Sequence, residues 1–211
     1  MLTGRTLVIE TATEACSVAL LDDGQAVADR HEVLGRGHAE RLVPLIALLP
    51  ERGRADRVLV SLGPGSFTGT RIGIAAARAL GLAWRVPVRG FATLQLVAVS
   101  ARALVDARAF TVLMAAGHGE SHLQRFADGG AVDAEPLLLP TAEALVLCHG
   151  ALVVGNQAEI VRAAGAATEA VFVLPRASDA GSLLPSALLE TTAPIYGRPP
   201  DARARSNGTA G

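Results

Sequence analysis

Short apolar runs separated by polar turns dominate the first 90 or so residues, and their lengths indicate β-strands. Four of these runs are predicted as strands: 6–10, 16–21, 26–33 and 57–62. The turn Asp22-Asp23-Gly24 favours a hairpin between the second and third strands. Apolar residues at helical spacing predict helices over 38–49 and 70–84, and a short strand follows over 86–88. The predicted order is three strands, a helix, a strand, a helix and a strand.

The same order returns in the second half of the chain. A helix is predicted over 93–107, and five strands follow it: 110–116, 120–126, 132–138, 152–154 and 171–174. Further helices are expected to begin at Thr141 and to cover 157–164 and 182–190. The repeat indicates an internal duplication with two α/β lobes, at 1–92 and 93–196. The segment 197–211, rich in Pro, Arg and Gly, is expected to be a flexible tail.

Composition excludes several classes of protein. Half of the 211 residues are hydrophobic and the net charge is −1, so the chain is expected to fold rather than remain disordered. The pI near 6.5 argues against binding nucleic acid by bulk charge alone. All nineteen basic residues are Arg, which excludes a Schiff-base lysine and a P-loop lysine. The two cysteines lie far apart, and no apolar run resembles a signal peptide or a membrane span, so a cytoplasmic protein is expected.

The segment Gly63-Pro-Gly-Ser-Phe-Thr-Gly69 lies between a predicted strand and a predicted helix. A glycine-rich turn at a helix N-terminus can present backbone N–H groups to an anion. However, the spacing G-x-G-x-x-x-G is one residue longer than the dinucleotide fingerprint, and a Walker A loop requires a lysine. The alternative is a tight turn whose glycines adopt positive φ angles and whose helix is capped by Ser66 or Thr68. Both interpretations remain open from spacing alone.

The helices on either side of this strand carry more apolar surface than one sheet can cover, which favours association with another protein through these helices. The residues expected at that partner interface are Leu42, Leu45, Ile46 and Leu49 in the first helix and Gly73, Ala76, Ala77 and Leu80 in the second. The alternative is that the second lobe covers them. Arg71, Arg78 and Arg85 recur every seven residues, and their stripe is either a solvated face or a contact for tRNA.

Few side chains indicate catalysis. Glu10 ends the first strand and is the best-placed carboxylate, although it can equally hold the adjacent turn by hydrogen bonds. His118 and His122 fall on a predicted strand-turn-strand, so they are expected to be a turn histidine and a surface histidine rather than metal ligands. No catalytic residue and no metal site is predicted with these side chains.

Several motifs carry a family resemblance. They are Ile9-Glu-Thr-Ala-Thr-Glu-Ala-Cys-Ser-Val-Ala19, His38-Ala-Glu40, Leu42-Val-Pro-Leu-Ile46, and the segments 63–73, 78–83 and 87–90. A weaker match returns over 193–201. Together these motifs resemble the TsaB (YeaZ) family, and the resemblance is strongest over about the first 100 residues.

The resemblance implies a duplicated actin-like α/β fold, in which each lobe has a mixed sheet flanked by helices. It implies a non-catalytic scaffold for the paralogue TsaD, which transfers a threonylcarbamoyl group to adenosine 37 of tRNA with the help of the ATPase TsaE. The two first-lobe helices would pair with TsaD or with a second copy of the chain, and tRNA would be contacted only through the complex. ATP would be used by the complex, and the chain would hold no cofactor of its own.

The sequence departs at several positions from the pattern that the resemblance implies. Thr93 and Val97 stand where the resemblance to TsaD places two metal-binding histidines, and neither can replace an imidazole. Glu10 replaces the first-strand Asp usual in the superfamily, and Ala115-Ala-Gly117 replaces the family's Asp-Ala-Arg. The alternative function is an ATP- or metal-dependent transferase, kinase or peptidase that acts alone. Its nucleotide-facing candidates are Glu10, Thr11, Thr13, Gly65 and Ser66.

Overall fold

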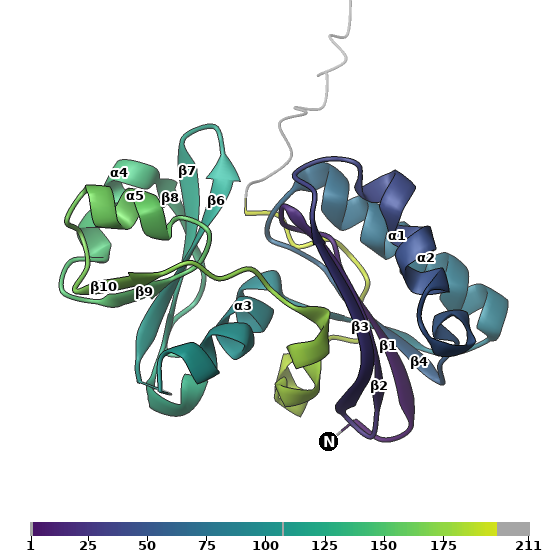
Figure 1. Cartoon of the computed structure of the whole chain (residues 1–211). Coiled ribbons are helices and arrows are strands. Elements are labelled where there is room, and N and C mark those ends of the chain that lie inside the picture. The colour runs from purple at the N-terminus through teal and green to yellow at the C-terminus, as the bar shows by residue number, and fades with distance from the viewer. Residues whose placement is uncertain (1, 107, 198–211) are drawn as a thin grey trace, which may run out of the picture.

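The computed structural model describes residues 2–106 and 108–197, which form two lobes (Figure 1). The first lobe is built on β1 (Arg5–Glu10), β2 (Ala15–Asp22), β3 (Gln25–Val33), β4 (Arg57–Ser61) and β5 (Val88–Phe91). The second lobe is built on β6 (Phe110–Gly117), β7 (Glu120–Phe126), β8 (Leu137–Pro140), β9 (Leu152–Val154) and β10 (Glu169–Val171). Each lobe therefore rests on one five-stranded sheet.

The two sheets share one topology. Their strand orders are β3-β2-β1-β4-β5 and β8-β7-β6-β9-β10, with β1 and β6 in the centre. In each sheet the three strands joined by hairpins pair antiparallel, and the last two strands join the central strand in parallel. This repetition confirms the predicted duplication, and the chain has the expected duplicated actin-like α/β fold.

Helices occupy equivalent places in the two lobes. α1 (His38–Ala47) and α2 (Phe67–Trp84) lie side by side on one face of the first sheet (Figure 1), and α4 (Thr141–Leu147) and α5 (Ala158–Ala163) follow the corresponding strands of the second lobe. Leu42 and Leu45 of α1 and Ala77 of α2 pack against Ile9 and Val60 of the sheet. The helical periodicity of the sequence thus predicts both first-lobe helices correctly.

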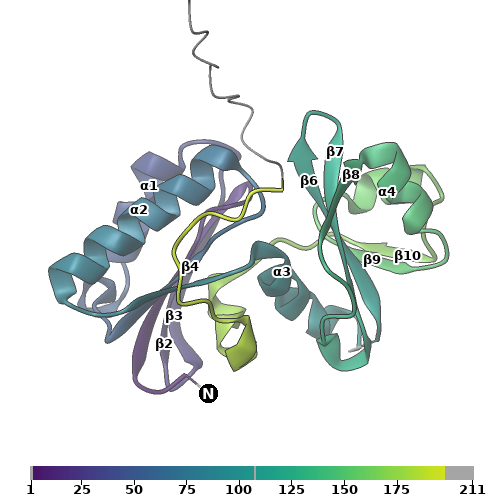
Figure 2. The same ribbon diagram turned by 180° about the vertical axis from the view of Figure 1, so that it is seen from behind.

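The last helix of each lobe crosses to the other one. α3 (Thr93–Ala101) follows β5 of the first lobe, but Leu94 and Val97 pack with Val112 of the second sheet. The 3-10 helix η4 (Ala177–Ser182) follows β10, but Ala180 packs with Val8 of the first sheet. Figure 2 shows both elements between the lobes. A boundary at residue 92 therefore does not separate the two packed units completely. The residues after β10 return to pack against the first sheet, although they lie in the second half of the chain.

The segment 188–196, which we term the strap, runs along the first lobe. Leu189 forms an antiparallel bridge with Gly90, and the N–H of Ile195 donates to the carbonyl oxygen of Leu62 at 2.7 Å. The prediction of a helix over 182–190 is wrong. Pro185 lacks an N–H and restricts the residue before it, so only the 3-10 turn η5 (Pro185–Ala187) forms there.

Prolines also account for two shifted strands. β5 begins at Val88 rather than residue 86, because Pro87 has no N–H to donate to the ladder. β8 begins only after Pro136, and Val132 makes a single bridge with Phe126. α3 ends at Ala101, and the 3-10 turn η2 (Arg102–Leu104) follows it.

The sequence also predicts a flexible tail and the absence of a membrane span. The expected flexible tail lies outside the described residues from residue 198 onward. Within 2–106 and 108–197, no helix combines the length and the apolar character needed to span a bilayer.

Candidate functional site

The glycine-rich segment 63–69, which we term the glycine loop, packs tightly against the β1–β2 turn. The N–H of Ser66 donates to the carbonyl oxygen of Ala12 at 2.7 Å, and the hydroxyl of Thr11 donates to the carbonyl oxygen of Gly69 at 2.8 Å. A Cβ atom added to Gly65 or Gly69 would lie 2.1 Å from a carbonyl oxygen of that turn. Only glycine permits this approach.

The start of α2 is capped from within. The hydroxyl of Ser66 accepts a hydrogen bond from the N–H of Gly69 at 3.1 Å. Gly63 has φ +90°, as the tight-turn interpretation requires. Since the chain's own β1–β2 turn occupies the inner side of the glycine loop, the structure favours a capped tight turn over a phosphate cradle.

Glu10, Thr11 and Thr13 are buried and serve the β1–β2 turn. Oε1 of Glu10 accepts a hydrogen bond from the N–H of Ala12 at 2.5 Å, while Oε2 has no hydrogen-bond partner among the described residues. Burial raises the pKa of Glu10 to about 7, and the nearby hydroxyl of Ser61 and the backbone N–H groups of the turn offset part of this effect. Of the five nucleotide-facing candidates, only Gly65 and Ser66 line the cavity described next.

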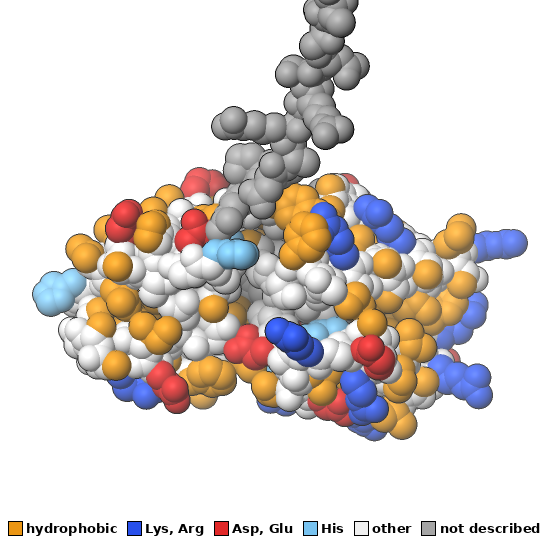
Figure 3. All heavy atoms as spheres, turned by 90° about the horizontal axis from the view of Figure 1, so that it is seen from above, with side chains coloured by type: hydrophobic (Ala, Val, Ile, Leu, Met, Phe, Trp, Pro, Cys, Tyr) orange, Lys and Arg blue, Asp and Glu red, His pale blue; other side chains and the backbone are white. Residues whose placement is uncertain are grey.

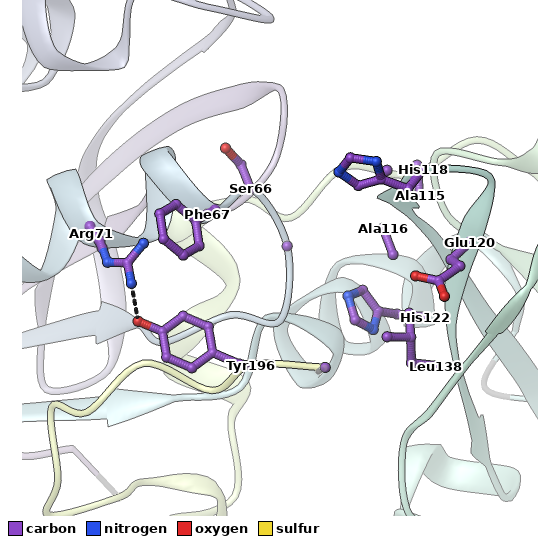
Figure 4. A pocket seen from close by; sticks show the side chains of 13 residues that line it. Ser66, Phe67, Arg71, Ala115, Ala116, His118, Glu120, His122, Leu138 and Tyr196 are labelled. Atoms are coloured by element: carbon purple, nitrogen blue, oxygen red, sulfur yellow. Dashed lines mark hydrogen bonds between the residues drawn. The ribbon is translucent and has the colours of Figure 1, made fainter. Parts of the chain in front are cut away.

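A cavity of about 640 Å³ lies between the lobes (Figure 4). One wall comes from the start of α2 and the end of the strap, and the other from β6, β7 and their turn. Its lining includes Ser66, Phe67, Arg71 and Tyr196 on the first wall and Ala116, His118, Glu120 and His122 on the second. Seen from above, apolar and basic side chains lie on one rim of this crevice and a histidine lies on the other (Figure 3).

Phe67, Arg71 and Tyr196 form an aromatic–arginine cluster. The guanidinium carbon of Arg71 lies 3.2 Å from the ring centroid of Phe67, and Nη2 donates to the hydroxyl of Tyr196 at 2.7 Å. Phe67 is 64% exposed and Tyr196 45% exposed. Neither aromatic ring lies in a sequence pattern that predicts a site. Tyr196 is the chain's single tyrosine, and its place beside α2 depends on the strap, which local sequence does not reveal.

His118 and His122 differ in how far they are exposed to solvent. His118 lies in the β6–β7 turn with φ +52° and is exposed, as predicted. His122 is buried at 5% exposure, so the prediction of a surface histidine is wrong. Of the positions where TsaD-type metal ligands would lie, Thr93 pairs with Ser61 at 2.7 Å and Val97 lies in the second-lobe core. Among the described residues, no group of three His, Cys, Asp or Glu side chains could hold a metal ion.

The residues expected at a partner interface lie mostly inside the chain. The buried ones are Leu42, Leu45, Ile46, Leu49, Gly73 and Ala77, and Ala76 and Leu80 are partly buried. The structure therefore revises this expectation: each helix turns its richest apolar stripe toward its own sheet, because burying that stripe stabilises the lobe. The apolar surface that remains exposed belongs to other residues, among them Val43, Leu48 and Leu82.

The arginine stripe on α2 has a structural role. Arg78 donates from Nε to the hydroxyl of Thr192 at 2.9 Å and from Nη2 to its carbonyl oxygen at 3.0 Å. Arg71 contacts Tyr196, as described above. These two arginines therefore hold the strap on α2.

Asn156 connects the lobes near the cavity. Its Nδ2 donates to Oε2 of Glu14 at 3.0 Å, and its Oδ1 accepts from the N–H of Ala115 at 2.8 Å. Glu14 follows β1 and Ala115 belongs to β6, so this side chain joins corresponding ends of the two central strands.

A comparison with protein families identifies one matching model. Residues 31–178 match the family described as TsaD, tRNA N6-adenosine threonylcarbamoyltransferase. The matched segment begins near the end of β3 and extends past β10, so it includes β4 and β5 of the first sheet and the whole second sheet.

Individual relatives agree with this match. The chain is 42% identical over 102 residues to the tRNA threonylcarbamoyladenosine biosynthesis protein TsaB of Escherichia coli, a match that covers 46% of this chain and 44% of that protein. It is 30% identical over 101 residues to the Bacillus subtilis protein of the same name, covering 46% and 44%. The chain thus spans less than half the length of these curated relatives.

Solved structures extend the similarity to nearly the whole chain. YeaZ from Pseudomonas aeruginosa superposes with a TM-score of 0.74 and 28% identity, covering 92% of this chain and 100% of that one. A protein from the same organism, described as similar to the peptidase YeaZ, gives a TM-score of 0.76 and 29% identity, covering 93% and 100%. The chain therefore belongs to the family that the matching model describes and, within it, to the TsaB/YeaZ proteins.

Proposed function

We propose that this chain is a non-catalytic subunit in the biosynthesis of threonylcarbamoyladenosine in tRNA. The names of its curated relatives support the process, since they are threonylcarbamoyladenosine biosynthesis proteins. The observation that carries the scaffold role is an exposed apolar face on α1 and α2. We term it the outer helix face, and it comprises Ala39, Val43 and Ala47 of α1 and Ala75, Ala79 and Leu82 of α2.

The outer helix face has the character of a protein interface. Leu82 is 83% exposed and Val43 is 63% exposed, although the inner stripes of both helices are already buried. The members recur every three or four residues, so each helix presents one continuous stripe. Small residues between the larger ones let another helix approach closely. An exposed apolar patch of this kind marks an interaction site in a protein that folds by itself.

The proposed occupant of the outer helix face is TsaD, with a second copy of this chain as the alternative occupant. The match to the TsaD family model supports this choice, because the two proteins would meet through lobes of the same architecture. Docking would favour the competent conformation of TsaD through tighter binding to that conformation. TsaE would assist, tRNA would be contacted through the complex, and the complex would work in the cytoplasm.

As a scaffold, this chain would carry out no chemistry and hold no cofactor of its own. The glycine loop is filled by the β1–β2 turn, and Glu10 and Thr11 are buried in that turn. The chain has no lysine, so it lacks the lysine that a Walker A nucleotide site requires. ATP would therefore be used by the partners.

Substitution of Leu82 tests the interface. Leu82→Asp places a charge in a face that TsaD would desolvate, so we expect its affinity for purified TsaD to fall at least about tenfold and threonylcarbamoyladenosine formation to fall with it. Titration calorimetry measures the affinity, and a reconstituted reaction measures the product. Val146→Asp on α4, at 73% exposure, is the matched control in the second lobe.

The outcomes separate the candidate functions. Wild-type affinity of Leu82→Asp at unchanged thermal stability would contradict the interface, as would an equal loss in Val146→Asp. Self-association that Leu82→Asp abolishes, without any TsaD binding, would assign the face to a second copy. ATP turnover by the isolated chain would replace the scaffold by the alternative, an ATP- or metal-dependent transferase, kinase or peptidase.

A further inference from the structure

A second cleft, of about 390 Å³, lies in the second lobe. The cavity between the lobes is lined by the end of β6 and the start of β7, whereas this cleft is lined by the start of β6 and the end of β7. The segment between α4 and β9 forms its other wall. We term this space the second-lobe cleft. It shares no lining residue with the cavity between the lobes, so it is a separate candidate site.

The floor of the second-lobe cleft is a polar residue in an otherwise apolar strand. Thr111 of β6 is 3% exposed, and its register partner on β7 is Arg125. Because side chains alternate along a strand, Thr111 lies on the same face of the sheet as Leu113, which packs in one cluster with Ala144 of α4. The Thr111 hydroxyl therefore faces the cleft, and it makes no hydrogen bond within residues 2–106 and 108–197.

Two opposite charges line the second-lobe cleft without pairing with each other. Asp133 lies beside Arg125, since the N–H of Asp133 donates to the carbonyl oxygen of Arg125 at 3.1 Å. Nevertheless, their side chains form no ion pair, and neither side chain makes a hydrogen bond to any residue that the structure describes. His149 is exposed after α4, and its ring is also without a partner in the described part of the chain. Both charges are therefore available to a ligand.

This pair of charges selects a ligand that itself carries both signs. A simple anion that approaches Arg125 is repelled by the carboxylate of Asp133, and a simple cation at Asp133 is repelled by the guanidinium. A zwitterion satisfies both, because a guanidinium binds a carboxylate through two parallel N–H groups and an aspartate accepts from an ammonium group. The Thr111 hydroxyl and the His149 imidazole add groups that can donate or accept.

The size of the second-lobe cleft favours a small ligand. Its volume of about 390 Å³ is near the lower end of the range of roughly 300–1,000 Å³ found for small-molecule sites. Leu147 and Leu152 contribute apolar surface to the lining. The cleft therefore suits a compact zwitterion with a short apolar side chain.

We infer that the second-lobe cleft binds a small free α-amino acid, whose carboxylate pairs with Arg125 and whose ammonium group pairs with Asp133. A free amino acid carries both charges on one carbon atom, whereas each end of a peptide carries only one of them. The outer helix face belongs to the first lobe, so this binding function is additional to the scaffold function and does not rest on it.

Three ligands of similar size test the charge requirement on the full chain. L-Alanine carries both charges, propionate lacks the ammonium group, and ethylamine lacks the carboxylate. We expect an NMR titration to shift the amide signals of Thr111 and Arg125 with alanine. Propionate and ethylamine should each bind about tenfold more weakly or worse, the effect of losing a hydrogen-bonded contact to a charged group.

Two results of these titrations would overturn the inference. If alanine at millimolar concentrations leaves the amide signals of the cleft unchanged, the cleft is not an amino-acid site. If propionate binds as tightly as alanine, the cleft is an anion site in which Asp133 has no role.

Arg125→Gln and Asp133→Asn assign the two charges. Both side chains are exposed, so both variants should fold, which thermal unfolding verifies. Each variant should weaken alanine binding about tenfold, whereas Arg125→Gln should not weaken ethylamine binding and Asp133→Asn should not weaken propionate binding. Arg36→Gln is the matched control, because Arg36 is exposed in the first lobe. Wild-type affinity for alanine in both cleft variants, or an equal loss in Arg36→Gln, would overturn the inference.

Thr111→Val tests the floor of the second-lobe cleft. Valine keeps the shape of threonine and removes the hydroxyl, so alanine binding should weaken about 2- to 10-fold, the effect of one neutral hydrogen bond. Unchanged affinity in a folded Thr111→Val would contradict the placement of the ligand against β6. None of these measurements involves TsaD, so their results are independent of those for Leu82→Asp.

Discussion

Glu10 is a buried carboxyl group whose pKa is raised from 4.5 to about 7 by burial. In the unfolded chain it ionises at a lower pH than in the native protein. Between these two values the unfolded state releases a proton that the native state keeps, so the free energy of unfolding falls as the pH rises. The difference corresponds to about 3 kcal/mol at most.

We therefore expect Glu10→Gln to gain stability relative to the wild type when the pH is raised from 5 to 8. A glutamine stays neutral and can still accept from the N–H of Ala12 through its carbonyl oxygen. Urea unfolding at the two pH values measures the difference. Glu159→Gln serves as the control, because Glu159 is exposed on α5 and water solvates its charge. Parallel pH dependence of the wild type and Glu10→Gln would contradict the assignment.

Gly69 gives a second prediction at the scale of one residue. In an exposed helix, replacing glycine by alanine stabilises by about 1 kcal/mol. Here the new Cβ would lie 2.1 Å from the carbonyl oxygen of Thr11, and overpacking of this kind costs about 1–3 kcal/mol. We expect Gly69→Ala to lower the thermal unfolding midpoint. A raised midpoint would show that the glycine loop does not press against the β1–β2 turn.

The candidate site could be predicted from the sequence only in part. Glu10, Thr11, Gly65 and Ser66 belong to contiguous motifs, and the structure brings these segments into contact. The aromatic–arginine cluster could not be predicted, because it joins residues 125 positions apart through a strap without regular secondary structure. Spacing arguments apply within one element and do not reach across the fold.

At the scale of elements, the two first-lobe helices show what a hydrophobic pattern determines. The periodicity predicts both helices and their apolar stripes correctly. The periodicity does not specify which apolar residues face the chain's own sheet, because that depends on how each helix is rotated about its own axis. The strongest stripe goes to the sheet, where it buries the most area, and the weaker stripe with Val43 and Leu82 stays outside.

The strap has no regular secondary structure, and side chains of α2 hold it in place. Arg78 holds it through two hydrogen bonds to Thr192. We expect Arg78→Ala to accelerate amide hydrogen exchange at Leu189 and Ile195 roughly fivefold, the effect of losing about 1 kcal/mol of local stability. Amides in the central strand β1 should keep their wild-type rates.

Arg85→Ala is the control for the strap. Arg85 is the left-handed cap residue directly after α2, and its side chain makes no hydrogen bond within residues 2–106 and 108–197. If Arg85→Ala accelerates exchange at Ile195 as much as Arg78→Ala does, the strap is not held by Arg78.

For the whole molecule, the crossing of α3 and η4 makes each lobe depend on the other half of the chain. Ala177, Ala180 and Leu183 cover a face of the first sheet that residues 1–92 cannot cover by themselves. We therefore expect a fragment of residues 1–92 to unfold without cooperativity, as measured by near-ultraviolet circular dichroism during heating. Co-expression with residues 93–211 should restore a cooperative transition. A sharp transition of the isolated fragment would contradict this dependence.

The overall fold could be predicted because the strand and helix order repeats, and a repeat in sequence order produces a repeat in topology. The exchange of the last helices could not be predicted. α3 begins two residues after β5 ends and η4 begins six residues after β10 ends, and nothing in a local pattern specifies which of two adjacent sheets such a helix will cover.

Helix α2 links two distant places in the molecule. Phe67 lies in its first turn, at the cavity, and Leu82 lies near its last turn, on the outer helix face. A straight helix of 18 residues is about 27 Å long. If a protein seated at one end tilts this rod by about 5°, the other end is displaced by roughly 2 Å. A protein bound at Leu82 would then move the Phe67 end of α2 relative to the second lobe and change the width of the cavity there.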